Sequence, residues 1–421
     1  MEYSIQNNLF TYATSELSQD AILAWTINNI NGSDELLKKL GLQLLSKMIG
    51  QPIEIERIKV FRQILNIDLL AEFEFDGKQQ ILIIEDKTGT SEHDNQIQKY
   101  IDLIKNECQE PNTGIEKTNA YGEKLPLLKV NKNCVIRVAF VKTHIITDFD
   151  ELRIRDIQIQ NKDVIIQKIS LEKLLEIYSE PLFMKHILVQ MFTEHLKKIH
   201  NLQDETKFKK AFIDWRPENG KNSYLLTTYY GQWLLMKELL PFEETNDHTI
   251  ILPDTKELFY KNYTYQGSSS GAPWTQSCFW EIPVNEHSKY EVYPRIRALF
   301  WRMDTYRISL NYYLDHPKKP ETDAKSKEIF KKCMEILEKI KKEIDKDYPD
   351  VIRIGNNKEI KPGQKETSMI TIYFENKTRL KKKAVPSMMT LKRIVHCIHS
   401  EFVEEFNNQC ALNCSPALKL K

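Results

Sequence analysis

The chain has 421 residues, which is enough for two or three domains that each bury a core of their own. Its 60 Lys and Arg residues nearly balance its 59 Asp and Glu residues, and a net charge of +1 excludes a global attraction to nucleic acid, so any such binding surface must be local. Seven scattered cysteines, the lack of a signal-peptide pattern and the lack of an apolar run of membrane-spanning length predict a soluble cytoplasmic protein.

The first elements in chain order are two helices and a strand. Apolar residues at helical spacing predict helices over 14–30 and 34–48, which an Asn-Gly-Ser break separates. Alternating residues predict a first strand over 53–63.

The stretch 66–100, NIDLLAEFEFDGKQQILIIEDKTGTSEHDNQIQKY, predicts a strand, a tight turn, a second strand and a helix. The turn is indicated by the Asp76-Gly77 pair between two apolar runs, because tight hairpin turns favour such pairs. The two strands are therefore expected to be antiparallel neighbours.

Acidic residues and a lysine gather where these two strands end. Side chains alternate along a strand, so Glu85 and Lys87 leave one face and Asp86 leaves the other. Asp68, on the neighbouring strand, can project toward Glu85. Two carboxylates beside a lysine make a site for a hard divalent cation such as magnesium.

These groups fit the hydrolysis of a phosphodiester bond. A bound divalent cation polarises a phosphoryl oxygen and lowers the pKa of a bound water. Lys87 adds positive charge where the transition state gains negative charge. The motif therefore predicts a metal-dependent phosphodiesterase.

Asp68, Glu85-x-Lys87 and the preceding helix with Glu16 resemble the PD-(D/E)xK nuclease superfamily. The resemblance implies an α/β fold, with a restriction-endonuclease-like mixed sheet flanked by helices. It also implies that Asp68 and Glu85 are metal-binding acids, that Lys87 is the catalytic lysine, and that Glu16 lies near a second metal. The other interpretation of Glu16 is an ordinary acid in the first turn of a helix.

Three further residues are assigned by the same resemblance. Gln96-x-x-x-Tyr100 is similar to the QxxxY element of the RecB-like branch, and residues four apart share a helix face, so both are expected to look back at the active site. The alternative is a polar helix face with one packed tyrosine. Asp86 is expected to have a structural side chain, while the family often uses the backbone carbonyl at this position as a metal ligand. The sequence departs from the family at Ile67, where a proline is usual.

Further strands and helices complete the N-terminal half. A buried strand is predicted over 135–141, an edge strand over 164–169, and helices over 171–178 and 181–202. The polar stretch 110–129 is expected to be a loop or an ordered insertion.

A composition shift near residue 203 predicts a domain boundary. Residues 1–203 are expected to form the nuclease-like domain and residues 204–421 an aromatic-rich α+β domain with a substrate, partner or regulatory role. The segments 224–233 and 263–280 are rich in aromatics and fit either a surface that stacks on bases or the core of a β-rich domain. We favour the core, except for 267–274, GSSSGAPW, which is expected to be an exposed loop that can contact a ligand or a nucleic-acid backbone.

Two charged patterns follow in the C-terminal half. Arg295, Arg297, Arg302 and Arg307 alternate with apolar residues, as if a strand pair displayed arginines on one face. A long charged helix is predicted over 323–348, and the densest basic run is 377–383. His396, Cys397, His399, Cys410 and Cys414 match no zinc-binding spacing that we know in this order.

The sequence thus predicts a deoxyribonuclease that uses Mg²⁺ or Mn²⁺, with DNA as its expected partner and no membrane. The resemblance suggests a bacterial role in DNA processing or in defence against foreign DNA. A homo-oligomer or a partner protein, held by the C-terminal domain, is compatible with this prediction. The alternative is a non-catalytic protein that binds nucleic acid or a partner through a degraded nuclease core, and the intact Asp68, Glu85 and Lys87 count against it.

Overall fold

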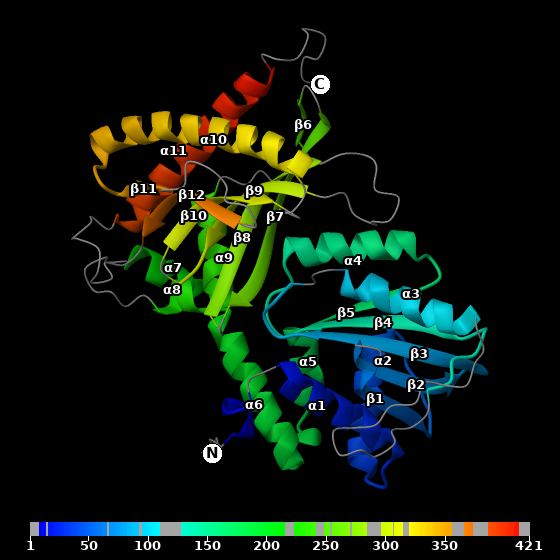
Figure 1. The fold of residues 1–421 in the computed structure, drawn as a ribbon. Coiled ribbons are helices and arrows are strands. Elements are labelled where there is room, and N and C mark those ends of the chain that lie inside the picture. Colours follow the sequence, from blue (N-terminus) through cyan, green and yellow to red (C-terminus); the bar gives the residue numbers. More distant parts are fainter. Residues whose placement is uncertain are drawn as a thin grey trace. The chain divides into compact units, whose positions relative to one another are not determined.

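The computed structural model divides the chain into two compact units, residues 1–204 and residues 205–421. It describes residues 8–13, 16–64, 67–91, 95–109, 128–214, 223–240, 248–252, 255–269, 272–283, 296–305, 307–314, 320–355, 366–373 and 386–411. The two units are described separately below (Figure 1).

The N-terminal unit is an α/β domain. Its helices and strands in chain order are α1 (Glu16–Asn28), α2 (Glu35–Ile49), β1 (Ile58–Ile64), β2 (Ile67–Phe75), β3 (Lys78–Lys87), α3 (Gln96–Gln109), β4 (Val135–Lys142), α4 (Asp148–Gln160), β5 (Ile165–Ser170), α5 (Leu171–Tyr178) and α6 (Ile187–Leu202). Single 3-10 turns lie at Leu9–Thr11, Asn29–Asn31 and Phe183–Lys185.

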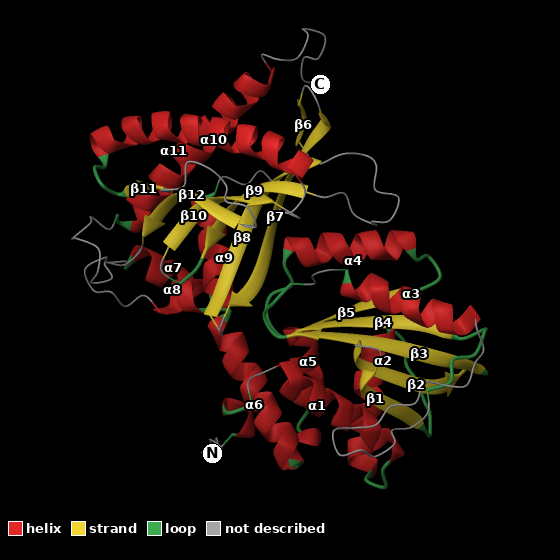
Figure 2. Cartoon of the chain, in the orientation of Figure 1, coloured by secondary structure: helices red, strands yellow, loops and turns green. Residues whose placement is uncertain are grey.

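The five strands form one mixed sheet in the order β1-β2-β3-β4-β5. Strands β1, β2 and β3 are antiparallel, and β3, β4 and β5 are parallel. Helices α1, α2, α5 and α6 pack on one face of the sheet and share a core with it. Helices α3 and α4 pack on the other face (Figures 1 and 2). The predicted fold class, a mixed sheet flanked by helices, is confirmed.

Local signals in the sequence place the first helices and the central hairpin. Asp34 caps α2, because its carboxylate accepts hydrogen bonds from the backbone N–H groups of Leu36 and Leu37. A Cβ atom at Gly41 would lie 2.6 Å from the backbone oxygen of Thr26, so glycine permits the close approach of α1 and α2. Asp76 and Gly77 both adopt positive φ at the turn between β2 and β3, as the Asp-Gly pair predicts.

Two predicted elements begin later in the structure, and one helix is additional to those predicted. Helix α4 was not predicted, because only a few of its residues, such as Ile154 and Ile157, are buried and its remaining residues are mostly charged or polar. The first strand begins at Ile58 rather than at residue 53. The last helix of the unit begins at Ile187 rather than at residue 181, since a 3-10 turn precedes it.

The C-terminal unit combines helices with one antiparallel sheet. Its elements in chain order are α7 (Glu205–Ile213), α8 (Ser223–Thr227), α9 (Tyr229–Leu239), β6 (His248–Leu252), β7 (Thr255–Ser269), β8 (Ala272–Pro283), β9 (Ile296–Met303), β10 (Arg307–Leu314), α10 (Pro320–Asp347), β11 (Ile352–Ile354), β12 (Glu366–Tyr373) and α11 (Met388–Ala411). The strand order is β11-β12-β10-β9-β8-β7-β6.

One face of this sheet forms a core with helices of the same unit. Trp301 of β9 and Leu310 of β10 share this core with Leu235 of α9, Leu337 of α10 and Val395 of α11. The expectation that residues 224–233 belong to β structure is wrong, because they form α8 and the start of α9. Residues 263–269 and 272–280 do lie in strands, on the antiparallel pair β7 and β8.

Two of the four arginines near β9 and β10 share one face. In the register of this pair Arg302 lies opposite Ser309, two residues after Arg307 on β10, so Arg302 and Arg307 lie on the same face. The side chain of Arg297 lies outside the described residues. Arg302 lies over the ring of Trp274, at 4.8 Å from its centroid, and bonds Glu366 at 2.9 Å. These contacts give Arg302 a structural role, and Arg295 lies outside the described residues.

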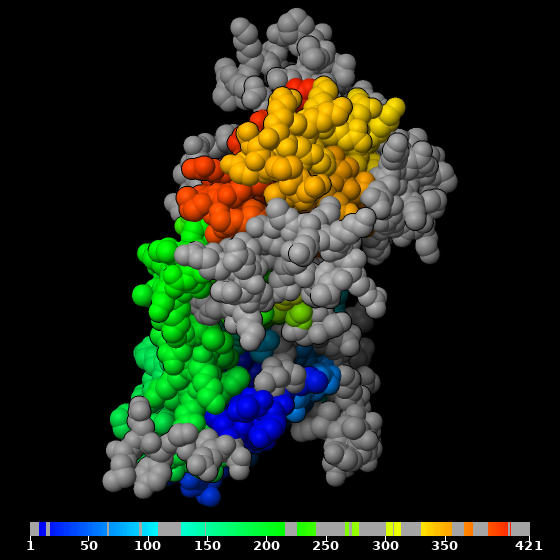
Figure 3. Space-filling view, turned by 90° about the vertical axis from the view of Figure 1, so that its left-hand side faces the viewer, coloured from blue at the N-terminus to red at the C-terminus, as the bar shows by residue number. Residues whose placement is uncertain are grey.

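Helix α10 lies at the surface of the C-terminal unit (Figure 3). Its apolar residues Phe330, Met334 and Leu337 face the core, as the predicted apolar stripe requires. The basic run 377–383 and Cys414 lie outside the described residues. Across the part of the chain that is described, no helix has both the length and the apolar character needed to cross a membrane.

His399 is the buried histidine of this core. Its Nδ1 accepts a hydrogen bond from Trp301 Nε1 at 3.4 Å. Burial lowers the pKa of the imidazole from 6.5 to about 4, and the nearby His396 adds to this shift. The neutral form of His399 is therefore the form that the folded core holds.

Acid is expected to destabilise the C-terminal unit through His399. Between pH 6.5 and 4 the unfolded chain binds more protons at this residue than the folded chain does. The contribution of His399 to the free energy of unfolding is therefore complete above pH 6.5 and falls by up to about 1.4 kcal/mol for each pH unit below it. Tryptophan fluorescence at increasing urea concentration, at pH 7.5 and pH 5.0, measures the loss. His399→Leu should flatten this pH dependence and His200→Gln, at an exposed position of α6, should not. If the free energy of unfolding of His399→Leu falls between pH 7.5 and pH 5.0 as much as that of the wild type, His399 is not the source of the pH dependence.

Candidate active site

The central hairpin of the N-terminal unit brings two predicted acids to one place. In the antiparallel register of β2 and β3, Leu69 lies opposite Ile84. One further step along both strands brings Asp68 opposite Glu85. Side chains that lie opposite each other in an antiparallel pair share a face, so both carboxylates lie on the same side of the sheet.

Glu85 and Lys87 form a buried ion pair on this face. Lys87 Nζ lies 2.7 Å from Glu85 Oε1, and their side chains are 5% and 0% exposed respectively. The Ile83 side chain precedes them on the same face and packs against α3. An ion pair so shielded from water interacts more strongly than an exposed pair.

Helix α3 covers the same face of the sheet. Tyr100 is buried there, in a core that also holds Ile83 and Ile97. Gln96 lies one turn before Tyr100, and its Oε1 is shielded from solvent without a hydrogen-bond partner among the residues that the structure describes. The structure therefore brings Gln96 and Tyr100 to the same side of the sheet as Glu85 and Lys87.

Asp86 points to the opposite face. Its Oδ1 accepts a hydrogen bond from Gln19 Nε2 of α1, and Gln19 Oε1 accepts one from Thr143 Oγ1 at 3.0 Å. Burial raises the pKa of the nearby Tyr178 hydroxyl, and the charge of Asp86 adds to this effect. The Asp86 side chain is thus part of a buried polar network between the sheet and helix α1.

Glu16 is the first residue of α1, and its side chain lies outside the described residues. Helix α1 packs on the face that Asp86 occupies, while Glu85 and Lys87 occupy the other. The backbone of Glu16 lies one turn before Gln19, on the part of α1 that contacts the end of β3.

A second buried ion pair, which the sequence analysis missed, lies beside the first. Strands β3 and β4 are parallel, and Lys142 is the register partner of Lys87. Lys142 Nζ lies 2.6 Å from Asp150 Oδ2, and both side chains are fully buried. Asp150 also accepts hydrogen bonds from the backbone N–H and the hydroxyl of Thr147, at 2.8 Å each.

Two signals in the sequence point to this pair. Lys142 ends an apolar strand, and a charge directly after such a strand marks a place where strand ends meet. Thr147-x-x-Asp150 is also the spacing of a capping box, which the structure contains at the start of α4. Neither signal identifies the two partners, because capping boxes are common and lysine has many possible acids.

His144 follows this strand end and carries no charge at neutral pH. The pKa of its imidazole is lowered to about 4, mainly by burial and in smaller part by the charge of Lys142. A hydrogen bond with the backbone of Thr88 acts in the opposite direction and is too weak to offset burial. The positive charge of this strand end therefore comes from Lys87 and Lys142 rather than from His144.

The donors on the α3 face fit a hard divalent cation. Mg²⁺ is commonly held by one or two carboxylates and completes its shell with water and substrate phosphate, and Asp68 and Glu85 supply two carboxylates. Within the described ranges no three His, Cys, Asp or Glu residues gather as a ready-made metal site. That statement does not cover Glu16, because its side chain is not described.

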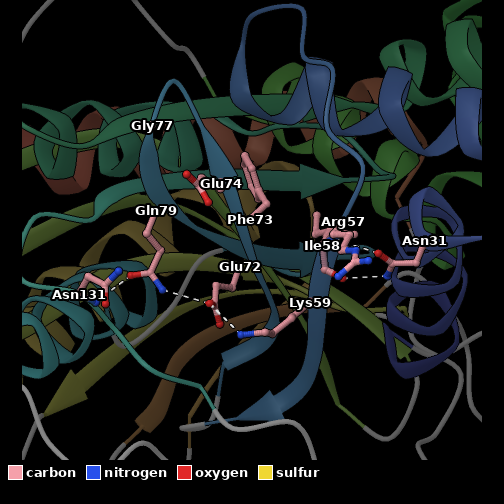
Figure 4. A pocket seen from close by; sticks show the side chains of 10 residues that line it. All are labelled: Asn31, Arg57, Ile58, Lys59, Glu72, Phe73, Glu74, Gly77, Gln79 and Asn131. Carbon is pink, nitrogen blue, oxygen red and sulfur yellow. Dashed lines mark hydrogen bonds and ion pairs between the residues drawn. The ribbon is translucent and has the colours of Figure 1, made fainter.

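A surface pocket of about 510 Å³ lies at the other end of the hairpin. Figure 4 shows a chain of contacts across it, from Asn131 through Gln79 and Glu72 to Lys59. Gln79 is six residues before Glu85 on β3, which is roughly 20 Å along a strand. This pocket is therefore separate from the candidate active site. Its charged groups Glu72 and Lys59 pair with each other.

The mixed sheet, its flanking helices and the acids on β2 and β3 define a restriction-endonuclease-like α/β domain. Residues 7–121 match the family model of the PD-(D/E)XK nuclease superfamily, and this part of the chain belongs to that superfamily. No curated protein and no solved structure matches the chain. The predicted superfamily is therefore confirmed for residues 7–121.

Proposed function

We propose that this protein is a metal-dependent nuclease that hydrolyses phosphodiester bonds of DNA. The observation that supports the proposal most is the placement of Asp68, Glu85 and Lys87 on one face, where β2 begins and β3 ends. All three residues lie within the segment that matches the nuclease superfamily.

The carboxylates of Asp68 and Glu85 hold Mg²⁺ or Mn²⁺ in this proposal, and Glu16 and the backbone carbonyl of Asp86 add oxygen ligands. When bound, the cation supplies charge to a phosphoryl oxygen and lowers the pKa of a water ligand. Asp68 is partly exposed and Glu85 is buried, so the site has a side open to substrate and a side closed to bulk water.

Lys87 stabilises negative charge as the phosphodiester bond breaks. Its Nζ already forms an ion pair with Glu85, which favours one position of the ammonium group. A charge that is already held in place needs little reorganisation when the bond breaks. Burial also strengthens the electric field of that charge. Gln96 and Tyr100 orient the substrate strand from α3.

The resemblance of the motif to DNA-cleaving relatives favours DNA over RNA, and DNA processing or defence against foreign DNA in bacteria is the corresponding role. The C-terminal unit then selects the substrate, binds a partner or a second copy of the chain, or regulates activity. Its antiparallel sheet and helices form a core of their own, as an accessory domain requires.

Cleavage by the purified chain tests the proposal. Supercoiled plasmid, linear duplex, single-stranded DNA and RNA are each incubated with Mg²⁺ or Mn²⁺, and the rate of loss is measured on gels. DNA should be cut and RNA should not. A plasmid that is cut faster than linear duplex identifies an endonuclease, whereas the reverse identifies an enzyme that needs ends.

Removal of divalent cations is expected to abolish cleavage and to lower the melting temperature. At a concentration of 100 times its dissociation constant, a cation that binds only the folded state stabilises it by about 2.7 kcal/mol. EDTA should remove this gain and excess Mg²⁺ should restore it. Undiminished cleavage in EDTA, or no cleavage of any substrate and no effect of Mg²⁺ on melting, would leave a non-catalytic binding protein as the better account.

A further inference from the structure

Gln19 connects helix α1 to the ends of two strands that border the candidate site. Thr143 Oγ1 donates to Gln19 Oε1 at 3.0 Å, and Gln19 Nε2 donates to Asp86 Oδ1. Gln19 is 4% exposed, and Thr143 and Asp86 are both fully buried. This chain of hydrogen bonds has one direction, because a carboxylate without a proton only accepts.

We propose that Gln19 is a positioning residue of the nuclease site, which holds the end of β3 in the geometry that binds the divalent cation. The inference rests on the proposed function. Gln19 does not reach the face that carries Glu85 and Lys87, so it acts through Asp86, the residue between them.

The end of β3 is held at two neighbouring points. The backbone N–H of Thr143 donates to the backbone oxygen of Lys87 at 3.2 Å, and the Thr143 side chain donates to Gln19. Asp86 lies immediately before Lys87 and is held by Gln19. A rotation of the Asp86 peptide would therefore move Glu85 and Lys87 together, and the Gln19 contact opposes that rotation.

The same contact fixes the first part of α1. Glu16 lies three residues before Gln19, and residues three apart lie on neighbouring parts of a helix surface. A shift of Gln19 away from β3 would therefore displace the proposed acid on α1 as well. Such partners of metal ligands commonly change metal affinity without touching the metal.

Gln19→Met tests the proposal, because methionine has a similar volume and makes neither hydrogen bond. Calorimetric titration of the full chain with MnCl₂, without substrate, should show an affinity that is roughly 10- to 100-fold lower than that of the wild type. Cleavage assays should show a matching rise in the Mn²⁺ concentration needed for half-maximal rate, with a smaller change in the rate at saturating Mn²⁺.

Thr26→Val is the matched control. Thr26 is also buried on α1, seven residues after Gln19, and its Oγ1 accepts a hydrogen bond from Tyr178 of α5 at 2.9 Å. This variant should lower the melting temperature and leave the affinity for Mn²⁺ unchanged. Equal losses of affinity in Thr26→Val and Gln19→Met would show a general effect of a weakened core and would overturn the proposal.

Thr143→Val completes the experiment. If Thr143 acts through Gln19, its replacement lowers the affinity for Mn²⁺ in the wild type and has little further effect in Gln19→Met. Independent, additive losses would overturn the proposed chain of contacts. Wild-type protein that binds no Mn²⁺ would overturn the proposed function and this inference together, whereas wild-type binding that Gln19→Met leaves unchanged would overturn this inference alone.

Discussion

Asp68→Asn and Glu85→Gln are each expected to reduce cleavage of DNA by about three orders of magnitude, because each replaces a proposed metal-binding carboxylate with a neutral group of the same shape. The two residues are adjacent across the β2 and β3 pair, so the double variant should lose little more than either single variant. Initial rates on plasmid at saturating Mg²⁺ measure the loss.

Glu72→Gln is the matched control for this experiment. Glu72 lies on the same strand and the same face as Asp68, four residues further along β2, and pairs with Lys59 at 3.0 Å. It should cleave at the wild-type rate and keep its fold, since a partly exposed ion pair contributes little. Full activity in Asp68→Asn or Glu85→Gln would contradict the assignment of these acids.

The central hairpin could be predicted because its signals are local. The Asp-Gly turn fixes the pairing of β2 and β3, and the alternation along a strand then places Glu85 and Lys87 on one face and Asp86 on the other. Once the pairing is known, the position of Asp68 opposite Glu85 follows. The sequence alone thus suffices for the arrangement of the acids.

The network around the hairpin could not be predicted, because its partners are far apart in the chain. Gln19 and Asp86 are separated by 67 positions and Gln19 and Thr143 by 124. Which helix covers which face of the sheet decides these contacts, and that choice depends on the packing of the whole unit. A buried glutamine on a helix gives no signal of its own partner.

The C-terminal unit shows a different limit. Residues 224–233 contain aromatic residues that favour strands, and they form helices instead. Thr228 caps α9 by accepting a hydrogen bond from the backbone N–H of Gly231, and Leu235 and Met236 bury the apolar side of that helix. Capping and burial outweigh the strand preference of the tyrosines here.

Asp150→Ala is expected to destabilise the N-terminal unit by about 3 to 5 kcal/mol, because it leaves the charge of Lys142 in a fully buried position without its carboxylate. It also removes the acceptor of the Thr147 backbone N–H and hydroxyl at the start of α4. Urea unfolding of the full chain at pH 7.5, followed by far-ultraviolet circular dichroism, measures the change in the free energy of unfolding.

The neighbouring residue supplies the control. Glu151 also pairs with a lysine, Lys168 of β5, and both side chains of that pair are well exposed to solvent. Glu151→Ala should cost less than about 1 kcal/mol, because water screens an exposed pair and replaces its hydrogen bonds. The double variant Lys142→Met with Asp150→Leu should recover much of the stability that Asp150→Ala loses, since it removes both charges from the core. Similar losses in Asp150→Ala and Glu151→Ala would show that burial does not set the strength of the Lys142 pair.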